Sequence, residues 1–583
     1  MQRVSYSEQR IQYAGADLTR NGSELTIKLA YNAVFGMGEK YDCLNHKGKK
    51  VINEVEEKFC FQGEKTYCPA PFFFTDSGFG FFADTTATTS FAFNEHEITV
   101  DLPEKTDIVL FNGTPREIIA EYMSLGGKPV LPPEWAFGVW ASANRWNKQS
   151  DIEELLEKME KYDLHSDIIV IEAWSDEATF YIFNGAKYSP VPDGKALEYD
   201  DFDFSDSPWP DPKGLIQKIH KANSHLVLWQ IPVYKKQGND EIQNTQNDLD
   251  REDAVKRSLS VKLTDGSPYT IPDGHWFSGS MIPDFTNPVT AETWFSKRRY
   301  LLDIGVDGFK TDGGEFIYRE DIIFADGTDG TLGKNRYASD YTKSYTSFVG
   351  DEHVLFSRAG FAAQHTVPIH WGGDQQSQNC ELKSVLTAGM SASLSGIIFW
   401  GFDIAGFAGA LPTPDLYRRA MALGCFCPIM QWHSEPDGGQ FKELMEGAEG
   451  NNERSPWNMA EAYNCPELIE EMRKLYAIRA KLRPYLAKTA KACVEHNMPM
   501  MRPLVYDWPA DEQAVACEDE FMLGDALLIA PLLEENAVSR EVYLPAGEWI
   551  GFFDRRVYNG GEVISSSVYP VPVYIRRGYE NQI

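Results

Sequence analysis

The chain has 583 residues, of which 43% are hydrophobic and 24% charged, and its formal net charge is −31. This length is too great for one hydrophobic core, so we expect a soluble globular protein that divides into a few domains. The excess of acid, with no local basic patch, disfavours binding to nucleic acid or to an anionic membrane and favours a neutral substrate.

The first 130 residues alternate apolar and polar positions in short runs that are separated by Gly, Asp and Asn turns. Alternation with a period of two predicts strands that bury one face. The clearest runs are 24–29, 72–74, 79–82, 97–102 and 107–111. Residues 1–130 are therefore predicted to form an N-terminal β-sandwich.

A second pattern begins at Pro132-Pro133, where predicted strands start to alternate with predicted helices. The predicted strands are 135–140, 167–171, 225–230, 306–311, 353–357, the approach to Asp374, and 396–400. The predicted helices are 148–162, 212–222, 291–302, 339–349 and 382–391. An eighth strand near 422–429 would close a (β/α)8 barrel, so residues 131–490 are predicted to form a TIM barrel of the α/β class.

Two further segments complete the predicted organisation. Residues 232–286 are rich in Asn, Asp and Gly and too long for an ordinary loop, which predicts a small insertion over the barrel mouth. After a helix at 465–482, β-type alternation returns at about Val494, with runs at 526–530, 540–544 and 568–576. Residues 491–583 are therefore predicted to form a C-terminal β-sandwich.

The first ten residues, MQRVSYSEQR, have no apolar signal core, and no apolar run is long enough to span a membrane, so a cytoplasmic location is expected. Nine cysteines, an odd number in a long chain, indicate reduced thiols that mostly pack in the interior. No cluster has convincing metal-ligand spacing, so we expect neither a metal ion nor an organic cofactor. The sequence does not indicate the oligomeric state.

Two carboxylates follow apolar segments at glycine-rich turns, a pattern of buried strands that deliver an acid to a loop. Asp312 lies in DIGVDGFKTDGGE at 303–315, and Asp374 ends HWGGD at 370–374. The active sites of barrel enzymes lie at that end of the strands, and glycoside hydrolysis requires at least two opposed carboxylates. The sequence therefore predicts that the two aspartates face each other across the barrel mouth.

Three other polar residues, Glu172, Arg358 and Asp403, also follow predicted strands. A charged residue that caps a strand at the surface explains any one of them alone. Together with the two aspartates they make five residues at the same end of successive strands, which a shared site explains better.

The same segments resemble glycoside hydrolase family 31, the retaining, exo-acting α-glucosidases and α-xylosidases. The resemblance runs from FGMGE at 35–39 to VPVYIR at 571–576. KTDGGE at 310–315 is similar to the KTDFGE form of the family's nucleophile motif, and HWGGD resembles its acid/base segment. The resemblance implies Asp312 as nucleophile, Asp374 as acid/base, and Arg358 as the arginine that precedes the acid/base.

The resemblance also implies a pocket for the terminal sugar. Trp276 precedes PDFTNP, which is similar to the family's PD-(Y/F)-TNP element, Asp403 begins DIAGF, similar to DIGGF, and His433 matches a histidine beyond it. The implied substrate-binding residues are Glu172, Trp174, Trp276, Lys310, Arg358, Trp371, Asp403, Phe407 and His433. Glu172 stands where the family usually has aspartate, and Lys310 replaces the tryptophan of many α-glucosidases, so the identity of the sugar stays open.

In a retaining mechanism one carboxylate attacks the anomeric carbon and the other protonates the leaving oxygen. We expect Arg358 and Lys310 to keep Asp312 ionised by their charge. We expect burial to raise the pKa of Asp374, and His433 to act as a neutral partner of sugar hydroxyls.

The expected activity is hydrolysis of a terminal α-linked sugar from an oligosaccharide or glycoside, with α-glucosides first. An α-galactoside, an N-acetyl-α-galactosaminide and an α-xyloside are alternative substrates. Transfer of the sugar to another sugar is an alternative reaction, and a catalytically inactive sugar-binding protein is an alternative of another class.

Overall fold

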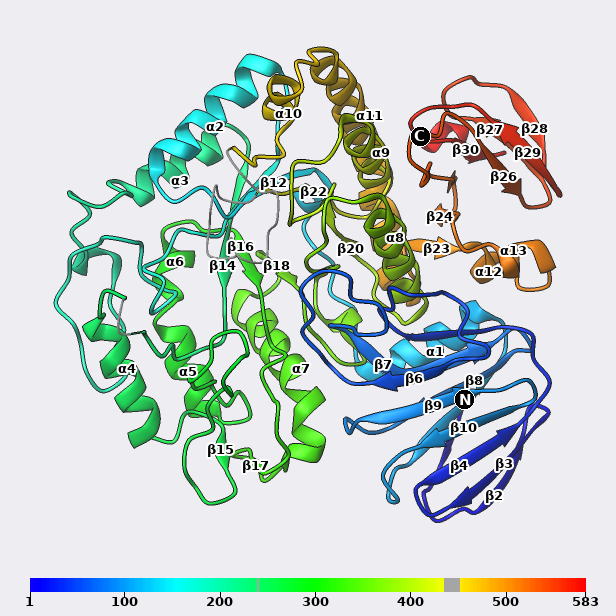
Figure 1. The fold of residues 1–583 in the computed structure, drawn as a ribbon, viewed down its shortest axis with the longest axis horizontal. Coiled ribbons are helices and arrows are strands. Elements are labelled where there is room, and N and C mark those ends of the chain that lie inside the picture. The colour runs from blue at the N-terminus through cyan, green and yellow to red at the C-terminus, as the bar shows by residue number, and fades with distance from the viewer. Residues whose placement is uncertain (239–240, 435–450) are drawn as a thin grey trace.

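The computed structural model describes residues 1–238, 241–434 and 451–583. The described chain forms three parts in sequence order: N-terminal antiparallel sheets, a central parallel barrel surrounded by helices, and C-terminal antiparallel sheets (Figure 1). The predicted fold class, a TIM barrel with a β domain on either side in sequence, is confirmed.

The N-terminal part is a sandwich of two sheets, with strand orders β1-β11-β8-β7-β5 and β2-β3-β4-β10-β9-β6. Phe73 of the first sheet contacts Phe91 and Phe93 of the second, with ring centroids 5.9 and 5.3 Å apart, so the sheets pack face to face. The strands are β1 (Gln2–Val4), β2 (Arg10–Tyr13), β3 (Ala16–Asn21), β4 (Glu24–Lys28), β5 (Val34–Gly38), β6 (Lys50–Asn53), β7 (Pro69–Thr75), β8 (Phe79–Ala83), β9 (Thr89–Phe93), β10 (Glu97–Asp101) and β11 (Ile108–Asn112).

A helix that the sequence analysis did not predict follows the sandwich, α1 (Pro115–Gly126). Its start is a capping box, in which the Thr114 side chain accepts from the Glu117 amide and the Glu117 carboxylate accepts from the Thr114 amide. Proline at the first helical position fits the same start.

The central sheet closes into a barrel of parallel strands. The strands in ring order are β12 (Val139–Ala143), β13 (Ile168–Ile171), β14 (His225–Gln230), β16 (Gly308–Thr311), β18 (Val354–Ser357), β19 (Ile369–Trp371), the two halves β20 (Trp400–Gly401) and β21 (Asp403–Ile404), and β22 (Met430–Trp432). β20 pairs with β19 and β21 pairs with β22, so the chain changes partner at Phe402. Because β22 also pairs with β12, this split strand completes the ring of eight.

Three predicted strands lie elsewhere in the structure. The strand expected at 396–400 starts only at Trp400, as β20. The strand expected at 135–140 starts only at Val139, because a 3-10 turn occupies Glu134–Phe137. The eighth strand, expected at 422–429, is β22, and the helix α9 (Pro414–Cys425) fills the first part of that run. A short, wholly apolar run fits a buried helix as well as a buried strand, so its pattern could not separate the two.

The helices around the barrel are α2 (Gln149–Tyr162), α3 (Pro212–Lys221), α5 (Pro288–Ser296), α6 (Arg299–Asp303), α7 (Gly330–Val349), α8 (Asn379–Leu394), α9, α10 (Pro456–Ala462) and α11 (Glu467–His496). The single helix predicted at 291–302 is the pair α5 and α6. α11 continues past its predicted end at residue 482 and through residue 490, and it lies between the barrel and the C-terminal sheets (Figure 1).

The segment 232–286 contains α4 (Thr245–Lys256) and β15 (Lys262–Leu263), which pairs with β17 (Ile322–Ile323). The C-terminal sheets have the orders β23-β24-β25-β30-β27-β28 and β26-β29. Their elements are β23 (Met501–Pro503), α12 (Leu504–Asp507), α13 (Glu512–Ala516), β24 (Phe521–Leu523), β25 (Leu527–Ile529), β26 (Arg540–Leu544), β27 (Glu548–Gly551), β28 (Val557–Asn559), β29 (Glu562–Ser566) and β30 (Val573–Arg576).

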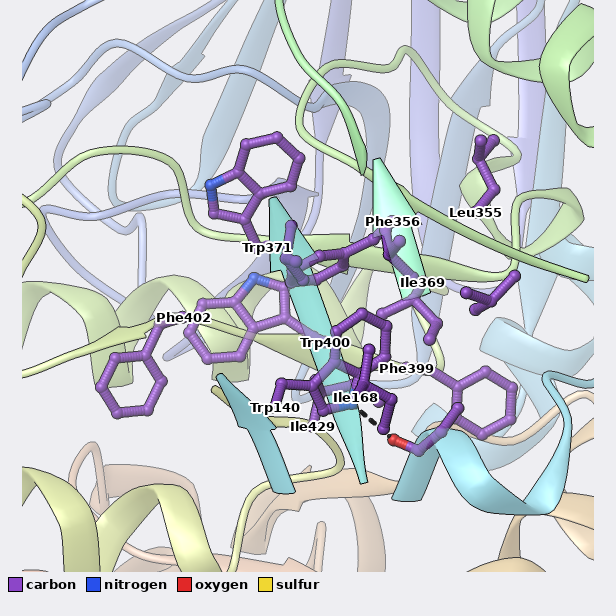
Figure 2. Packing of buried hydrophobic residues seen from close by; sticks show 14 of the residues in the cluster. Trp140, Ile168, Leu355, Phe356, Ile369, Trp371, Phe399, Trp400, Phe402 and Ile429 are labelled. Atoms are coloured by element: carbon purple, nitrogen blue, oxygen red, sulfur yellow. Dashed lines mark hydrogen bonds between the residues drawn. The ribbon is translucent and has the colours of Figure 1, made fainter. Parts of the chain in front are cut away.

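Large aromatic side chains pack inside the barrel (Figure 2). The Phe356 ring lies between two tryptophans, and its centroid is 5.0 Å from that of Trp140 and 5.1 Å from that of Trp371. The barrel is therefore a filled core, and Trp371 is the member of this stack that also lines the pocket described below. No helix in the described part of the chain combines the length and the apolar character needed to cross a bilayer.

Candidate active site

A pocket of about 370 Å³ opens at the carboxyl ends of the barrel strands. Its size and its mixed aromatic and charged walls are typical of small-ligand sites. It is lined by Glu57, Phe59, Asn144, Glu172, Glu177, Trp229, Gly274, His275, Trp276, Lys310, Asp312, Arg358, Trp371, Asp374 and Phe407. Both predicted catalytic aspartates and six of the other predicted residues, namely Glu172, Trp276, Lys310, Arg358, Trp371 and Phe407, are therefore brought together.

Asp312 directly follows β16 and is surrounded by donors. The indole nitrogen of Trp229 donates to Oδ2 at 3.0 Å, and the amide of Gly313 donates to Oδ1 at 2.7 Å. Arg358 Nη1 lies 3.1 Å from Oδ1. Such donors stabilise a carboxylate as an anion, the form that a nucleophile needs.

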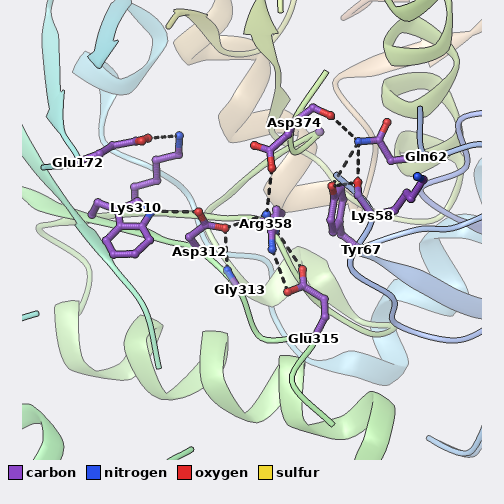
Figure 3. A network of polar contacts seen from close by, with 12 residues as sticks. Lys58, Gln62, Tyr67, Glu172, Lys310, Asp312, Gly313, Glu315, Arg358 and Asp374 are labelled. Carbon is purple, nitrogen blue, oxygen red and sulfur yellow. Dashed lines mark hydrogen bonds and ion pairs between the residues drawn. The ribbon is translucent and has the colours of Figure 1, made fainter. Parts of the chain in front are cut away.

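Arg358 bridges three carboxylates (Figure 3). It makes a bidentate pair with the buried Glu315, with Nε and Nη2 each 3.1 Å from a carboxylate oxygen. Its Nη1 lies 3.1 Å from Asp312 and 3.5 Å from Asp374. The Tyr67 and Trp276 rings lie beside the guanidinium, with centroids 4.6 and 5.6 Å away. The arginine is thus fixed from several sides, and it fixes the spacing of the two aspartates.

Asp374 is held at the mouth by the N-terminal domain. Gln62 Nε2 donates to its backbone carbonyl at 2.6 Å. Burial raises the pKa of the Asp374 carboxyl well above its usual range despite the lowering effect of the Arg358 charge, and the charge of Asp312 adds to the rise. A carboxyl that keeps its proton near neutral pH can serve as a general acid.

Glu172 lies in a buried cluster with Lys310 and His433. Lys310 Nζ and His433 Nε2 lie 2.6 and 2.9 Å from the same oxygen, Oε1. Burial alone would raise the pKa of Glu172, but the charge of Lys310 and the contact with His433 lower it to about 2. Lys310 was expected to hold Asp312, whereas its direct partner in the structure is Glu172.

Three predicted substrate-binding residues do not line the pocket. The buried Trp174 donates through its indole nitrogen to the Trp229 carbonyl at 3.0 Å, behind the pocket wall. His433 is fully buried and directs Nε2 to Glu172. Asp403 lies in β21, almost fully buried, and accepts from the side-chain nitrogen Nε2 of Gln431. These residues contact the residues that line the pocket or the strands beneath them.

Several lining residues were not predicted. Glu57 and Phe59 belong to the loop 54–68, which joins β6 and β7 and reaches from the N-terminal sandwich to the barrel mouth. Trp229 lies near the end of β14 and Asn144 directly follows β12. Both positions are at the carboxyl ends of barrel strands, the same criterion that identified the predicted residues, so this criterion could have found them. Nothing in the local pattern of the loop 54–68 marks it as part of a site.

Two clusters of possible metal ligands occur among the described residues. One is His220, His225 and Asp307, and the other is Cys517, Asp519 and Glu520. None of these six residues lines the pocket. The groups in the pocket itself are carboxylates paired with Arg358 and Lys310, an arrangement suited to acid, base and nucleophilic chemistry.

Family models match most of the chain. The model of the glycosyl hydrolases family 31 TIM-barrel domain matches residues 129–489, the family 31 C-terminal domain matches 497–579, and the family 31 N-terminal galactose mutarotase-like domain matches 11–91. The chain belongs to glycoside hydrolase family 31. The family that the sequence motifs indicated is thereby confirmed.

Individual members of family 31 are similar over almost the whole chain. The isomaltosyltransferase of Sporosarcina globispora is 34% identical over 96% of this chain and 52% of its own length. The 1,3-alpha-isomaltosidase of Kribbella flavida is 35% identical over 93% of this chain and 75% of its own length. The cycloalternan-degrading enzyme from Trueperella pyogenes, solved in complex with a covalent intermediate, has a TM-score of 0.90 and 34% identity over 98% of this chain and 80% of its own. The chain spans about half the length of the isomaltosyltransferase.

Proposed function

We propose that the chain is a retaining, exo-acting α-glycosidase that cleaves α-glucosidic bonds at the non-reducing ends of oligosaccharides. The observation that carries this proposal is the contact of Asp312 and Asp374 with one nitrogen of Arg358, at 3.1 and 3.5 Å. Their contacting oxygens cannot be farther apart than these two distances combined. This bound allows the separation of about 5–5.5 Å found in retaining pairs and excludes nearly all of the range of about 6.5–9.5 Å found in inverting pairs, which supports retention.

In the first step Asp312 attacks the anomeric carbon while Asp374 gives its proton to the leaving oxygen, so the glycosidic bond breaks and an alcohol departs. The sugar is then an ester of Asp312. In the second step Asp374 takes a proton from water, the water oxygen attacks the anomeric carbon, and the ester bond breaks. Asp312 is again a carboxylate, Asp374 again an acid, and the sugar keeps its α configuration.

The choice of α-glucosides rests on two features. The relatives similar over most of this chain are named for isomaltosyl and cycloalternan chemistry, which supports an α-glucan substrate. In the pocket, Glu172 offers a fixed acceptor beside Lys310 as donor, and paired groups of this kind select among sugar hydroxyls by hydrogen bonding.

A panel of 4-nitrophenyl α-glycosides tests the proposal. We expect the α-glucoside to have a higher kcat/KM than the α-galactoside, the N-acetyl-α-galactosaminide and the α-xyloside, and the first-formed sugar to be the α anomer by NMR. Asp312→Ala should fold but lose nearly all turnover, and azide should restore activity with a β-glycosyl azide as product. A β anomer as first product, or near wild-type activity of Asp312→Ala, would contradict the proposal.

Transfer to a sugar acceptor is the second candidate, favoured by the similarity to an isomaltosyltransferase. Chemically it differs only in the second step, where a sugar hydroxyl replaces water as the attacking group. Product analysis at high substrate concentration distinguishes the two, because transfer produces oligosaccharides longer than the substrate.

A further inference from the structure

The position of the acid fixes the direction in which a substrate crosses the pocket. Under the proposed function, the leaving group lies beside Asp374, since that residue protonates its oxygen. Asp374 lies next to Gln62 and Tyr67 of the N-terminal domain, whereas Glu172 lies on the far side of Asp312 (Figure 3). The transferred sugar therefore extends away from the N-terminal domain and toward Glu172.

The order of the strands in the barrel places a second carboxylate farther from the leaving group than Glu172. β13 is the second strand of the ring and β19 is the sixth, so the loops after them face each other across an eight-stranded barrel. Asp374 follows β19, and Glu177 lies in the loop after β13 and lines the same pocket. Glu177 is thus on the side opposite the leaving group, farther along its loop than Glu172.

The loop that carries Glu177 is firmly held. The Asp176 carboxylate accepts from the Thr179 amide at 2.9 Å and from Asn244 Nδ2 at 2.8 Å. Lys235 Nζ donates to the Glu177 carbonyl at 2.8 Å. Glu177 itself has φ of 53°, a left-handed conformation that costs free energy for a residue with a side chain and that recurs at functional sites.

The Glu177 carboxylate is exposed at the rim, and no described residue forms a hydrogen bond or an ion pair with it. Lys235, whose charge acts on Glu177, forms its ion pair with Glu241 at 3.0 Å. Desolvation within the pocket raises the pKa of the Glu177 carboxyl to about 7, so the group is mainly a carboxylate above that pH. A braced, strained loop therefore holds a carboxylate with free lone pairs at the open end of the pocket. Carboxylate oxygens are strong acceptors for sugar hydroxyls.

We propose that Glu177 binds hydroxyl groups of a second sugar unit, so that the unit released or transferred is a disaccharide rather than a single glucose. This inference rests on the proposed function and specifies its donor. The isomaltosyl names of two relatives indicate an α-1,6-linked glucose as the second unit. The hydrolytic product is then isomaltose, with the water oxygen on its anomeric carbon, and the leaving alcohol keeps the proton from Asp374.

The test compares 4-nitrophenyl α-isomaltoside with 4-nitrophenyl α-glucoside, which share a leaving group and differ only in the second sugar. We expect wild type to prefer the isomaltoside by at least tenfold in kcat/KM. Above pH 7, where Glu177 is ionised, Glu177→Ala should reduce that ratio about tenfold to a hundredfold, the effect of losing hydrogen bonds to a charged acceptor. Glu252→Gln is the control, because it removes one charge from an exposed position of α4 that does not line the pocket, and it should keep the wild-type ratio.

A second measurement separates binding from turnover. We expect isomaltose to bind the Asp312→Ala enzyme more tightly than glucose by calorimetry, and the added Glu177→Ala change to remove that difference. If neither aryl glycoside is hydrolysed, the proposed function fails, while the calorimetric difference still tests the second sugar position. If the glucoside is hydrolysed and the ratio is the same in wild type and Glu177→Ala, the second position is wrong and the proposed function stands.

Discussion

Asp312 and Asp374 contact the same nitrogen of Arg358, yet the proposed mechanism needs one of them ionised and the other protonated. Their remaining surroundings differ. Asp312 also accepts from Trp229 and Gly313, whereas the Asp374 carboxylate has no donor other than Arg358 among the described residues. Unequal hydrogen bonding and burial thus assign the roles of two chemically identical side chains.

The raised pKa of Asp374 predicts the basic limb of the pH profile. Only the protonated acid can donate, so kcat/KM should fall as pH rises through the pKa of Asp374. Asp374→Ala should abolish this limb and slow alkyl α-glycosides by at least a hundredfold more than activated aryl α-glycosides, because only a poor leaving group needs a proton. Initial rates between pH 5 and 9 measure both effects.

Equal losses for the two leaving-group classes, or a basic limb that survives in Asp374→Ala, would show that another residue donates the proton. Glu315 is a suitable comparison, because it contacts Arg358 and burial raises its pKa as well. It does not line the pocket. Glu315→Gln should therefore alter the position of the limb without removing it.

Sequence reasoning located these residues well because their positions depend on a local feature. A buried strand that ends in a polar residue is visible in a short window, and Glu172, Asp312 and Arg358 each directly follow a strand of the barrel. The contacts between them were harder to predict. Lys310 was expected to act on Asp312 by its charge, and it does, but its direct ion pair with Glu172 was not predicted, because that contact joins strands far apart in sequence.

At the scale of elements, the turn after β19 requires a particular residue, glycine, just before the aspartate that it carries. Gly373 has φ of 65°, and an added Cβ there would overlap the Tyr67 ring. The turn thus approaches the N-terminal domain as closely as a residue without a side chain allows. This close approach brings Asp374 within reach of Gln62.

We predict that Gly373→Ala lowers kcat at least tenfold in addition to destabilising the protein. The left-handed backbone alone costs alanine roughly 1–2 kcal/mol. Gly327 is a matched control, because its φ is 88° and a Cβ there would meet nothing within 4 Å. Gly327→Ala should therefore show the backbone cost in thermal unfolding with kcat near wild type, and equal kcat losses in the two variants would contradict a role for the Tyr67 contact.

Two elements show where the sequence was insufficient. α9 and β22 share one apolar run, and period alone could not divide it into helix and strand. The loop 54–68 looks like any polar connection between strands, yet it supplies Glu57 and Phe59 to the pocket. Its position follows from how two domains dock, which no short window of sequence encodes.

At the scale of the whole molecule, the segment 38–41 fastens the N-terminal sandwich to the barrel. The Gly38 amide donates to Ser395 Oγ at 2.8 Å, and the Tyr41 hydroxyl donates to the Gly372 carbonyl at 2.9 Å. Between them the buried Glu39 accepts from the Trp400 indole at 2.7 Å. Burial raises the pKa of Glu39 from 4.5 to about 7.

This raised pKa makes stability depend on pH. The stabilisation from neutral Glu39 is fully present below about 4.5 and is lost as pH rises through about 7. Glu39→Gln keeps a neutral acceptor for Trp400 and removes that loss, which is on the order of 3 kcal/mol across the window. The thermal midpoint of the variant relative to wild type should therefore rise between pH 5 and pH 8.

Glu39→Ala separates titration from packing, because it removes the acceptor for Trp400 and should lower the midpoint at every pH. The difference in thermal midpoint between wild type and Glu39→Gln is the quantity to compare. If it is the same at pH 5 and pH 8, Glu39 is already ionised at pH 5 in the folded protein.

The loop 54–68 also constrains how such a protein can be recombined. A crossover placed at the start of the barrel would exchange Glu57 and Phe59 together with the sandwich, and so would replace one wall of the pocket while leaving Asp312 in place. Chimeras that swap N-terminal domains between related enzymes should consequently inherit their preference for the leaving group from one parent and their nucleophile from the other.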